Sequence, residues 1–356
     1  MKYLVNARFL SQKVTGVQRY ALSCSLALQD LLGEEVIFVA PQGTLVSDSL
    51  KFKNLVQIGC LSGHLWEQVS LASYAKSVGY PYVFCFSGLP PVFYNRSVYC
   101  IHDLAIYRYP KAFSRLYGLF YRAMTKIAVT TSSHIFCVSE FTKSEILDIL
   151  KYDSAFVVNN TLPSEFESLN SVKCDSLDLA YGSPYILAVG SIEPRKNLDR
   201  LISAFDRLKV PGLKLIIIGA AGHAFRQSKV VGNHNENIIF GGYISDAYLQ
   251  NLYSRALCFI YPSLYEGFGI PPLEAMSKNC PVLASNCSSI PEVCGDAALY
   301  FNPHSVDAIF NVISKFLDLS QKDQQRTVLL GNTRLMLFSK ENQKKQLHEL
   351  VSSLPN

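Results

Sequence analysis

The chain lacks the features that mark several large protein classes. Its apolar runs stay brief, as in Ile186–Val189 and Leu215–Ile218, far below the ~20 residues of a membrane-spanning helix. The ten cysteines form no C-x-x-C pair and no zinc spacing with histidine, and free thiols suit a reducing cytoplasm. G-x-G-x-x-G, G-x-S-x-G, H-E-x-x-H and D-x-D are missing as well. We therefore expect no dehydrogenase, serine hydrolase or zinc protease, and neither a metal nor another cofactor.

Charge is also scarce, since charged residues make up 17% of the 356 residues and hydrophobic ones 49%. This balance indicates a globular chain that is long enough for two domains. Cys280, Cys287 and Cys294 recur at a regular interval, which small buried side chains near strand ends explain better than the alternative, a metal site. The segment Met1–Arg8 has no long apolar core and predicts a first strand rather than a signal peptide.

One long segment contains no acidic residue, the stretch between Asp103 and Glu140. Its cations alternate with aromatic side chains: Arg108, Lys111, Arg115, Arg122 and Lys126 with Tyr107, Tyr109, Phe113, Tyr117, Phe120 and Tyr121. Such a mixture suits an anionic membrane surface, and equally a helix with aromatics toward the core and cations toward water. No recognised nucleic-acid-binding motif accompanies it, so we expect no nucleic-acid partner.

Short apolar runs alternate with amphipathic stretches in both halves, which predicts parallel sheets covered on both faces. The expected fold is α/β, with two doubly wound, Rossmann-like domains facing a central cleft at the strand C-termini. Predicted strands cover 3–6, 36–40, 55–58, 82–86, 98–101, 134–138, 185–189, 214–218, 238–240, 257–261, 282–284 and 299–301. Predicted helices cover 17–31, 65–78, 141–150, 197–208, 245–254, 271–276 and 306–317.

The domains follow from the same pattern. We expect a first domain over 1–165, a polar linker over 166–183 and a second domain over 184–339. A charged C-terminal helix over 340–356 is expected to pack back onto the first domain.

The most informative motif is the run Ser263–Met276, in which Glu266 and Glu274 flank a Gly-Phe-Gly turn and a proline pair. Glycines let backbone amides approach a ligand, and the N-terminus of a helix behind them attracts phosphate. A helix starting at Pro271 places Glu274 in its first turn. A carboxylate there accepts hydrogen bonds from sugar hydroxyls, so the run predicts a nucleotide-sugar site. By itself the run also fits a turn before a well-capped helix.

Two cations follow a predicted strand of the second domain. Arg195 and Lys196 lie on the loop after Gly190, where ligands bind in such folds, and together they could hold a pyrophosphate. Glu193 could instead pair with one of them.

The first domain offers three candidates at strand ends. Gly16 opens the first helix, where its backbone could approach a phosphate or a sugar. His102 and Asp103 end another predicted strand; the imidazole is a titrating group and a neutral hydrogen-bond donor, and the carboxylate could orient it or bind a hydroxyl. A purely structural His–Asp pair is the alternative.

Together these segments resemble the GT-B glycosyltransferases of family 4, the retaining nucleotide-sugar enzymes. The resemblance is carried by Gly16–Tyr20, His102–Leu104, Val138–Ile146, Gly190–Leu198, Gly242–Ile244, Tyr261–Met276, Ser288–Val293 and Gly295–Ala298. The match spans residues 1 to about 340, and the two glutamates of the long run form the family's E-x7-E element.

The resemblance implies a role for each matching position. It assigns donor binding to Gly16, Arg195, Lys196, Gly242, Tyr243, Phe268, Gly269, Ile270 and Glu274. It assigns catalytic contacts to His102, Asp103 and Glu266. Glu274 would hold the ribose, and the base would lie near Gly242 and Tyr243. The segment Trp66–Gln68 resembles one on the acceptor side of bacterial polysaccharide mannosyltransferases.

The resemblance favours transfer of mannose from GDP-mannose, with retention and without a metal, onto a bacterial surface glycan such as lipid-linked O-antigen. The donors dTDP-rhamnose, GDP-fucose and UDP-hexoses stay open. A non-catalytic binding subunit of the same fold is the alternative from another class. The expected partners are the nucleotide sugar, a lipid-linked oligosaccharide and the inner membrane surface, which places the protein in the cytoplasm, peripheral on that membrane.

Overall fold

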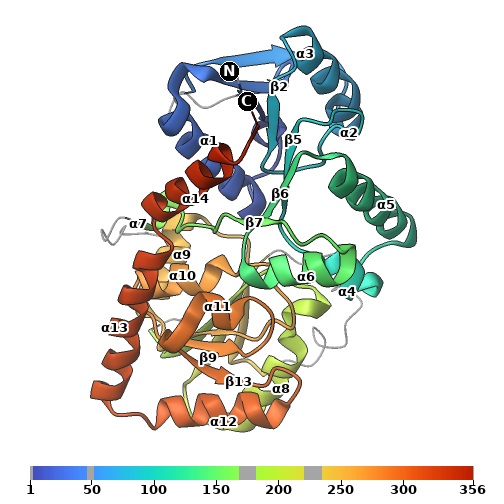
Figure 1. Cartoon of the computed structure of the whole chain (residues 1–356). Helices are drawn as coiled ribbons and strands as arrows, with labels where there is room; N and C mark the ends of the chain where they lie inside the picture. Colours follow the sequence, from blue (N-terminus) through green and yellow to red (C-terminus); the bar gives the residue numbers. More distant parts are fainter. Residues whose placement is uncertain (1–2, 46–51, 168–181, 220–234, 356) are drawn as a thin grey trace. The chain divides into compact units, whose positions relative to one another are not determined.

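The computed structural model describes residues 3–45, 52–167, 182–219 and 235–355, which form two compact units (Figure 1). Unit 1 comprises Met1–Thr161 and Phe338–Asn356, and unit 2 comprises Leu162–Leu337.

The predicted linker over 166–183 lies largely outside the described residues, which omit 168–181. The residues just before that gap form a short helix, α7 (Ser164–Glu167). Phe166 of this helix is buried against the ring of Tyr253, with 6.2 Å between the centroids. The start of the predicted linker is therefore folded onto unit 2.

Unit 1 is built on a seven-stranded parallel sheet with the strand order β3-β2-β1-β4-β5-β6-β7. The strands are β1 (Tyr3–Asn6), β2 (Val36–Pro41), β3 (Leu55–Ile58), β4 (Tyr82–Cys85), β5 (Ser97–Ile101), β6 (His134–Cys137) and β7 (Phe156–Val157). In the register, Leu4 of β1 lies between Ile37 and Val83. The chain changes direction across the sheet between β1 and β4, so the loops after these two strands diverge.

The helices of unit 1 cover this sheet. They are η1 (Arg8–Ser11), α1 (Gly16–Leu32), η2 (Gly33–Glu35), α2 (Gly63–Leu65), η3 (Trp66–Leu71), α3 (Ala72–Ser77), α4 (Ala105–Arg108), η4 (Pro110–Ala112), α5 (Arg115–Thr131), α6 (Glu140–Leu150) and α14 (Lys340–Ser352). The single helix predicted over 65–78 is three pieces, because η3 in its middle is a π-helix.

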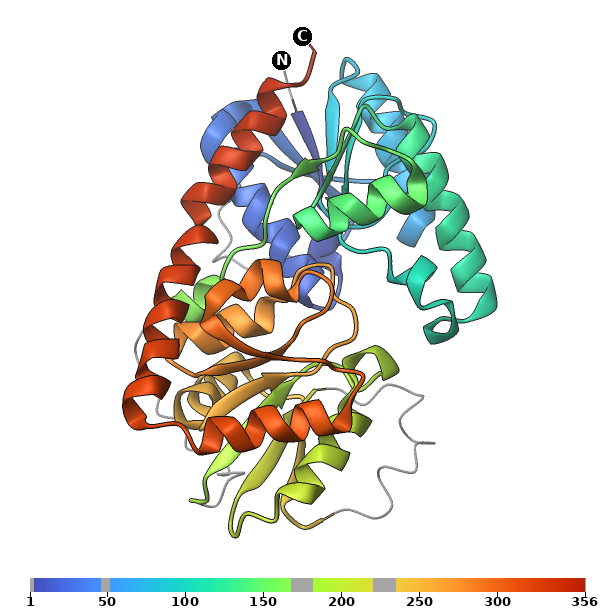
Figure 2. The same cartoon turned by 60° about the horizontal axis from the view of Figure 1, so that its bottom comes forward.

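The C-terminal helix α14 lies along α1, as Figure 2 shows for the red and blue helices. Their contact includes a hydrogen bond of 2.7 Å from the Ser23 hydroxyl to Gln343. Gln343 and Gln346 also bond to Asn159, which follows β7. The last helix of the chain therefore belongs to unit 1.

Unit 2 repeats the design with a six-stranded parallel sheet in the order β10-β9-β8-β11-β12-β13. Its strands are β8 (Tyr185–Val189), β9 (Lys214–Ile218), β10 (Ile238–Gly242), β11 (Cys258–Tyr261), β12 (Val282–Ser285) and β13 (Ala298–Phe301). Counted from the start of the unit, this is the order 3-2-1-4-5-6 of dinucleotide-binding domains, and the direction reverses between β8 and β11.

The helices of unit 2 cover its sheet. They are η5 (Pro194–Lys196), α8 (Leu198–Leu208), α9 (Asp246–Arg255), α10 (Ile270–Ser277), α11 (Ile290–Cys294), η8 (Gly295–Ala297), α12 (Val306–Leu317) and α13 (Gln321–Leu337). Helices α8 and α12 pack together (Figure 2). They bury the side chains of Leu201, Phe205, Ile309 and Ile313 against the sheet. Each such side chain stabilises the fold by about 1.5–3 kcal/mol.

Every strand pair in both sheets is parallel, so the predicted doubly wound α/β architecture of each unit is confirmed. Across the described parts of the chain, no helix combines the length and the apolar character needed to cross a bilayer.

Candidate active site

The loops after β8 and β11 meet at the point where the strand order of unit 2 reverses. Parallel strands on either side of such a point send their crossovers to opposite faces of the sheet, which leaves a crevice at their carboxyl ends. The loop after β8 contains η5 with Arg195 and Lys196, and the loop after β11 contains Glu266. A backbone hydrogen bond of 2.8 Å from Leu264 N–H to the Arg195 carbonyl joins the two loops.

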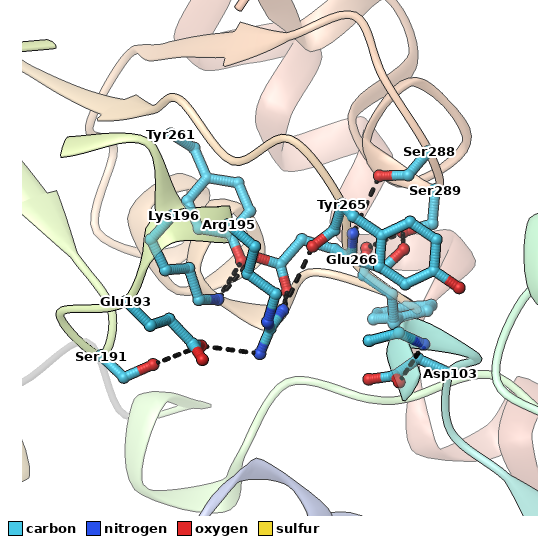
Figure 3. Close-up of polar contacts among 12 residues, drawn as sticks. Asp103, Ser191, Glu193, Arg195, Lys196, Tyr261, Tyr265, Glu266, Ser288 and Ser289 are labelled. Atoms are coloured by element: carbon cyan, nitrogen blue, oxygen red, sulfur yellow. Dashed lines mark hydrogen bonds and ion pairs between the residues drawn. The ribbon is translucent and has the colours of Figure 1, made fainter. Parts of the chain in front are cut away.

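Glu266 receives both cations (Figure 3). The Arg195 guanidinium lies 3.0 Å from one of its carboxylate oxygens, and the Lys196 ammonium lies 2.5 Å from the other. The second terminal nitrogen of Arg195 pairs with Glu193 at 2.9 Å. The pairing of Glu193 with one cation was an alternative from sequence, whereas the double pairing of Glu266 was not foreseen.

The two cations fix the charge of the Glu266 side chain, which is 9% exposed. Burial by itself would raise the pKa of this carboxyl, but Lys196 and Arg195 outweigh burial and lower the pKa to about 2. Glu266 is therefore an anion at neutral pH and an acceptor of hydrogen bonds, not a proton donor.

Neighbouring loops hold the backbone of this acidic turn. The Ser288 hydroxyl accepts the Glu266 N–H at 3.0 Å, and the Ser289 hydroxyl lies within 2.9 Å of the carbonyl oxygens of Glu266 and Phe268. Asn197, which is buried after η5, donates to the carbonyls of Pro262 and Pro303. From sequence, Ser288 and Ser289 belonged to the family resemblance but had no assigned role, and Asn197 was not singled out.

Helix α10 begins directly behind the Gly-Phe-Gly turn. Its N-cap Gly269 has φ +104°, which an L-residue rarely adopts, and this explains the glycine. Pro271 and Pro272 have no N–H, so the amides of Gly269 and Ile270 are the donors left at this helix start. Among the described residues, these two N–H groups meet no protein acceptor.

Glu274 does not occupy the first turn of α10, and that prediction was wrong. The helix begins at Ile270, one residue earlier than predicted, so Glu274 is its fifth residue and the first turn contains no acidic side chain. The Tyr253 hydroxyl donates to Glu274 at 3.1 Å. The residue remains half-buried on the helix that Gly269 caps.

His102 and Asp103 directly follow β5, which ends at Ile101, and their hydrogen bonds differ from the expected ones. The His102 Nε2–H donates to the Phe86 carbonyl at 2.7 Å, so the expected donor is occupied and Nδ1 is left as an acceptor. Burial lowers the pKa of His102, against smaller opposing effects of Phe86 and Asp103, which favours this neutral form. Asp103 accepts the N–H of Ala105 at 2.9 Å and so starts α4.

Three further residues that were predicted to bind the nucleotide-sugar donor lie at or next to the end of a helix or strand. Gly16 is the exposed first residue of α1, whose first turn contains no acidic side chain. Gly242 closes β10 with φ +64° and accepts the Gly219 N–H at 2.9 Å, and Tyr243 beside it is 73% exposed.

The alternative metal site finds no support in the parts of the chain that the structure describes, where no group of three acidic, histidine or cysteine side chains could hold an ion. Cys280 and Cys294 are buried, as expected for small side chains near strand ends, and Cys287 is half-buried.

The chain belongs to the glycosyl transferases group 1. That family's profile matches residues 175–335. The chain is 33% identical over 265 residues to O-antigen chain mannosyltransferase B of Escherichia coli, covering 70% of this chain and 68% of that protein. It is 30% identical over 215 residues to O-antigen chain mannosyltransferase RfbU of Salmonella typhimurium, covering 60% and 58%. It spans only 24% of the serotype-specific mannosyltransferase WbdA of Escherichia coli, at 34% identity over 197 residues and 51% of this chain.

Solved structures confirm the GT-B fold. WaaG, a glycosyltransferase involved in lipopolysaccharide biosynthesis, aligns with a TM-score of 0.70 at 15% identity, over 99% of this chain and 100% of that one. HepE from Anabaena, in complex with UDP and glucose, aligns with a TM-score of 0.71 at 17% identity over the same shares. The protein is thus a GT-B glycosyltransferase, as the motifs indicated.

Proposed function

We propose that this glycosyltransferase moves mannose from GDP-mannose onto a lipid-linked bacterial surface glycan, with retention at the anomeric carbon. The relatives are two O-antigen chain mannosyltransferases and a serotype-specific mannosyltransferase. Their names support mannose as the transferred sugar and a surface glycan as the acceptor. The alternative donors for the same reaction are dTDP-rhamnose, GDP-fucose and UDP-hexoses.

The cluster of Arg195, Lys196 and Glu266 is the observation that carries the proposal. Two cations held at the carboxyl end of β8 match the charge that a nucleoside diphosphate gains as it leaves. In the free protein Glu193 and Glu266 pair with these two cations, and a bound diphosphate would share or replace those contacts. We propose that these side chains, with the amides of Gly269 and Ile270, stabilise the leaving group without a metal.

The proposal also gives roles to other predicted residues of each unit. Glu266 accepts a hydroxyl of the transferred sugar, Glu274 holds the ribose, and the base lies near Gly242 and Tyr243. His102 from unit 1 offers its Nδ1 to a further sugar hydroxyl, next to Asp103.

The proposed reaction needs no separate carboxylate base. The bond between the anomeric carbon and the diphosphate oxygen breaks through an oxocarbenium-like transition state. The acceptor oxygen bonds to that carbon on the same face, and the departing phosphate oxygen takes the acceptor proton. Retention of configuration follows from this front-face route.

The proposal includes a position at the inner face of the membrane, in the cytoplasm, because the acceptor carries a lipid. Helix α5 supports it with exposed apolar side chains, since Leu116 is 83% and Leu119 is 70% exposed. Arg115 and Lys126 on the same helix are exposed cations, and this combination suits an anionic bilayer.

Nucleotide-dependent stabilisation tests the proposal. In a thermal-shift panel of GDP, UDP and dTDP with and without their sugars, we expect GDP and GDP-mannose to raise Tm most. Binding of ligand to the folded state at 100 times its Kd stabilises by about 2.7 kcal/mol. If no nucleotide raises Tm, the alternative of a non-catalytic binding subunit replaces the transferase.

A further inference from the structure

Glu274, to which the proposed function assigns the ribose, lies one helical turn beyond the amides of Gly269 and Ile270. It is the fifth residue of α10, so it shares a face of the helix with Ile270. Helical side chains lean toward the N-terminus, which directs this carboxylate back toward the start of α10. The ribose of a nucleoside diphosphate is bonded directly to its first phosphate, so a group that holds the ribose has to lie close to the phosphate donors.

The start of a helix does not by itself orient a carboxylate at the fifth position. The positive end of the helix acts on groups within the first turn, and its effect falls off beyond that turn. A glutamate side chain also has several rotatable bonds, and ordering them when the ligand binds costs conformational entropy. A contact from another element is therefore needed to orient the carboxylate before the nucleotide arrives.

Tyr253 on the neighbouring helix α9 supplies such a contact. Its hydroxyl donates to Oε2 of Glu274 at 3.1 Å, and α9 packs against α10 (Figure 1). Burial raises the pKa of Tyr253 well above its usual value, and the charge of Glu274 raises it further. The hydroxyl therefore stays protonated at neutral pH and acts as the donor of this hydrogen bond.

Two phenylalanines hold the ring of Tyr253, which is fully buried. The ring lies 5.4 Å from Phe259 of β11 and 6.2 Å from Phe166 of α7, measured between centroids. The ring planes meet at 70° and 71°, close to the edge-to-face arrangement that aromatic pairs prefer. Helix α7 is the first element of unit 2, and it packs against both α9 and α10. These contacts fix the ring, so its hydroxyl stays directed at Glu274.

We propose that Tyr253 is a positioning residue for the donor: its hydroxyl sets the direction of the Glu274 carboxylate, and so determines how strongly the protein prefers a ribose to a sugar without its 2′ and 3′ hydroxyls. The inference rests on the proposed function, because it is there that Glu274 holds the ribose. Tyr253 is fully buried and acts only through Glu274. A tyrosine that merely joined α9 to α10 would stabilise unit 2 without changing this preference.

Two nucleotides that differ only at the ribose test the proposal. GDP and 2′,3′-dideoxy-GDP are titrated against the full chain by isothermal calorimetry, and the ratio of their Kd values measures recognition of the ribose. For wild type we expect a ratio of about tenfold to a hundredfold, the range of hydrogen bonds to a charged group. In Tyr253→Phe, which keeps the ring, the ratio should fall about threefold to tenfold, because the carboxylate is no longer oriented.

Tyr185→Phe is the matched control. Tyr185 is also buried, and its hydroxyl donates at 2.7 Å to the carbonyl of Leu252, the residue before Tyr253 on α9. This variant loses a buried hydrogen bond of the same helix but none to Glu274, so Tm should fall while the ratio stays at its wild-type value. An equal fall of the ratio in both variants would mean that Tyr253 only stabilises the helix, and would overturn the proposal.

Glu274→Gln separates this inference from the proposed function. We expect this variant to lose most of the ratio, and Tyr253→Phe added to it to change the ratio no further, because both residues act through one contact. If Glu274→Gln loses the ratio but Tyr253→Phe keeps or increases it, the positioning role is overturned and the donor assignment stands. If wild type binds both nucleotides equally, or neither of them, the ribose assignment itself fails and the positioning role fails with it.

Discussion

Glu266 pairs with both cations of the cluster, Arg195 and Lys196. In the proposed function its carboxylate also accepts a hydroxyl of the transferred sugar. The half-buried Ser288, the buried Ser289 and the buried Asn197 amide hold the backbone around it.

Removal of one cation should slow transfer without unfolding the protein. We expect Lys196→Gln to lower kcat/KM roughly tenfold to a thousandfold, because the leaving diphosphate loses about 1.4–4 kcal/mol of stabilisation. Steady-state kinetics with the donor measure the effect. Lys315→Gln, an exposed lysine on α12, is the control and should leave the rate unchanged; equal rates for both variants would remove Lys196 from the mechanism.

Glu266 should make stability depend on acid. Because its pKa is lowered from 4.5 to about 2 in the folded state, its contribution is fully present above pH 4.5 and is lost as the pH falls toward 2. Relative to Glu266→Gln, wild type gains on the order of 3 kcal/mol at pH 7 by this linkage. Urea midpoints at pH 7, 4 and 3 measure the difference; a gap that stays constant with pH would contradict the ion-pair account.

At the scale of elements, the apolar strands were predictable and the polar or distorted elements were not. Each predicted strand agrees with the structure within two residues, because a buried parallel strand is a continuous apolar run. Strand β7 has two residues and α13 (Gln321–Leu337) has a weak apolar stripe, so neither was predicted. The π-helix η3 depends on the partners of Glu67, which lie far away in sequence.

The ends of β8 and β9 approach too closely for any side chain but hydrogen. A Cβ on Gly219 would lie 1.9 Å from the carbonyl oxygen of Gly190, within the loop that leads to Arg195. We therefore expect Gly219→Ala to destabilise unit 2 by about 1–3 kcal/mol, as overpacking does, and to weaken GDP binding. Gly118→Ala on α5 meets no atom within 4 Å and serves as the control. Equal melting temperatures and GDP affinities for the two variants would refute the tight contact.

Helix α5 covers part of the acid-free segment and has side chains in different environments. The rings of Tyr117 and Tyr121 line a cavity of unit 1, while Leu116 and Leu119 are exposed. Arg122 is engaged inside the unit, since it donates to the Ile106 carbonyl at 3.0 Å.

Liposome binding tests the exposed face of this helix. The double change Arg115→Glu and Lys126→Glu should weaken binding to anionic vesicles about thirtyfold, from ~1 kcal/mol for each lost cation. Co-sedimentation with vesicles rich in anionic lipid measures it, and neutral vesicles provide the baseline. Unchanged binding would contradict the membrane proposal. Arg122 is left intact in the double variant, so its contact with the Ile106 carbonyl is kept and weaker binding is not explained by the loss of that contact.

At the scale of the whole molecule, each sheet reverses its strand order, and the cluster of Arg195, Lys196 and Glu266 lies at the reversal in unit 2. Parallel strands place the ends of β8 and β11 side by side, so the sequence could predict that Arg195, Lys196 and the Glu266 run share a site. It could not predict that Glu266 pairs with both cations, or that Phe86 occupies the donor of His102, because those contacts join residues distant in sequence. The sequence leaves the donor open among GDP-mannose, dTDP-rhamnose, GDP-fucose and UDP-hexoses.

Product analysis tests the central claim most directly. The protein is incubated with GDP-mannose and a lipid-linked mannose acceptor, and the anomeric configuration of the new linkage is determined by NMR. The account predicts an α-mannoside, formed by wild type and strongly reduced in Lys196→Gln. A β-linked product, or transfer from another nucleotide sugar but none from GDP-mannose, would contradict it.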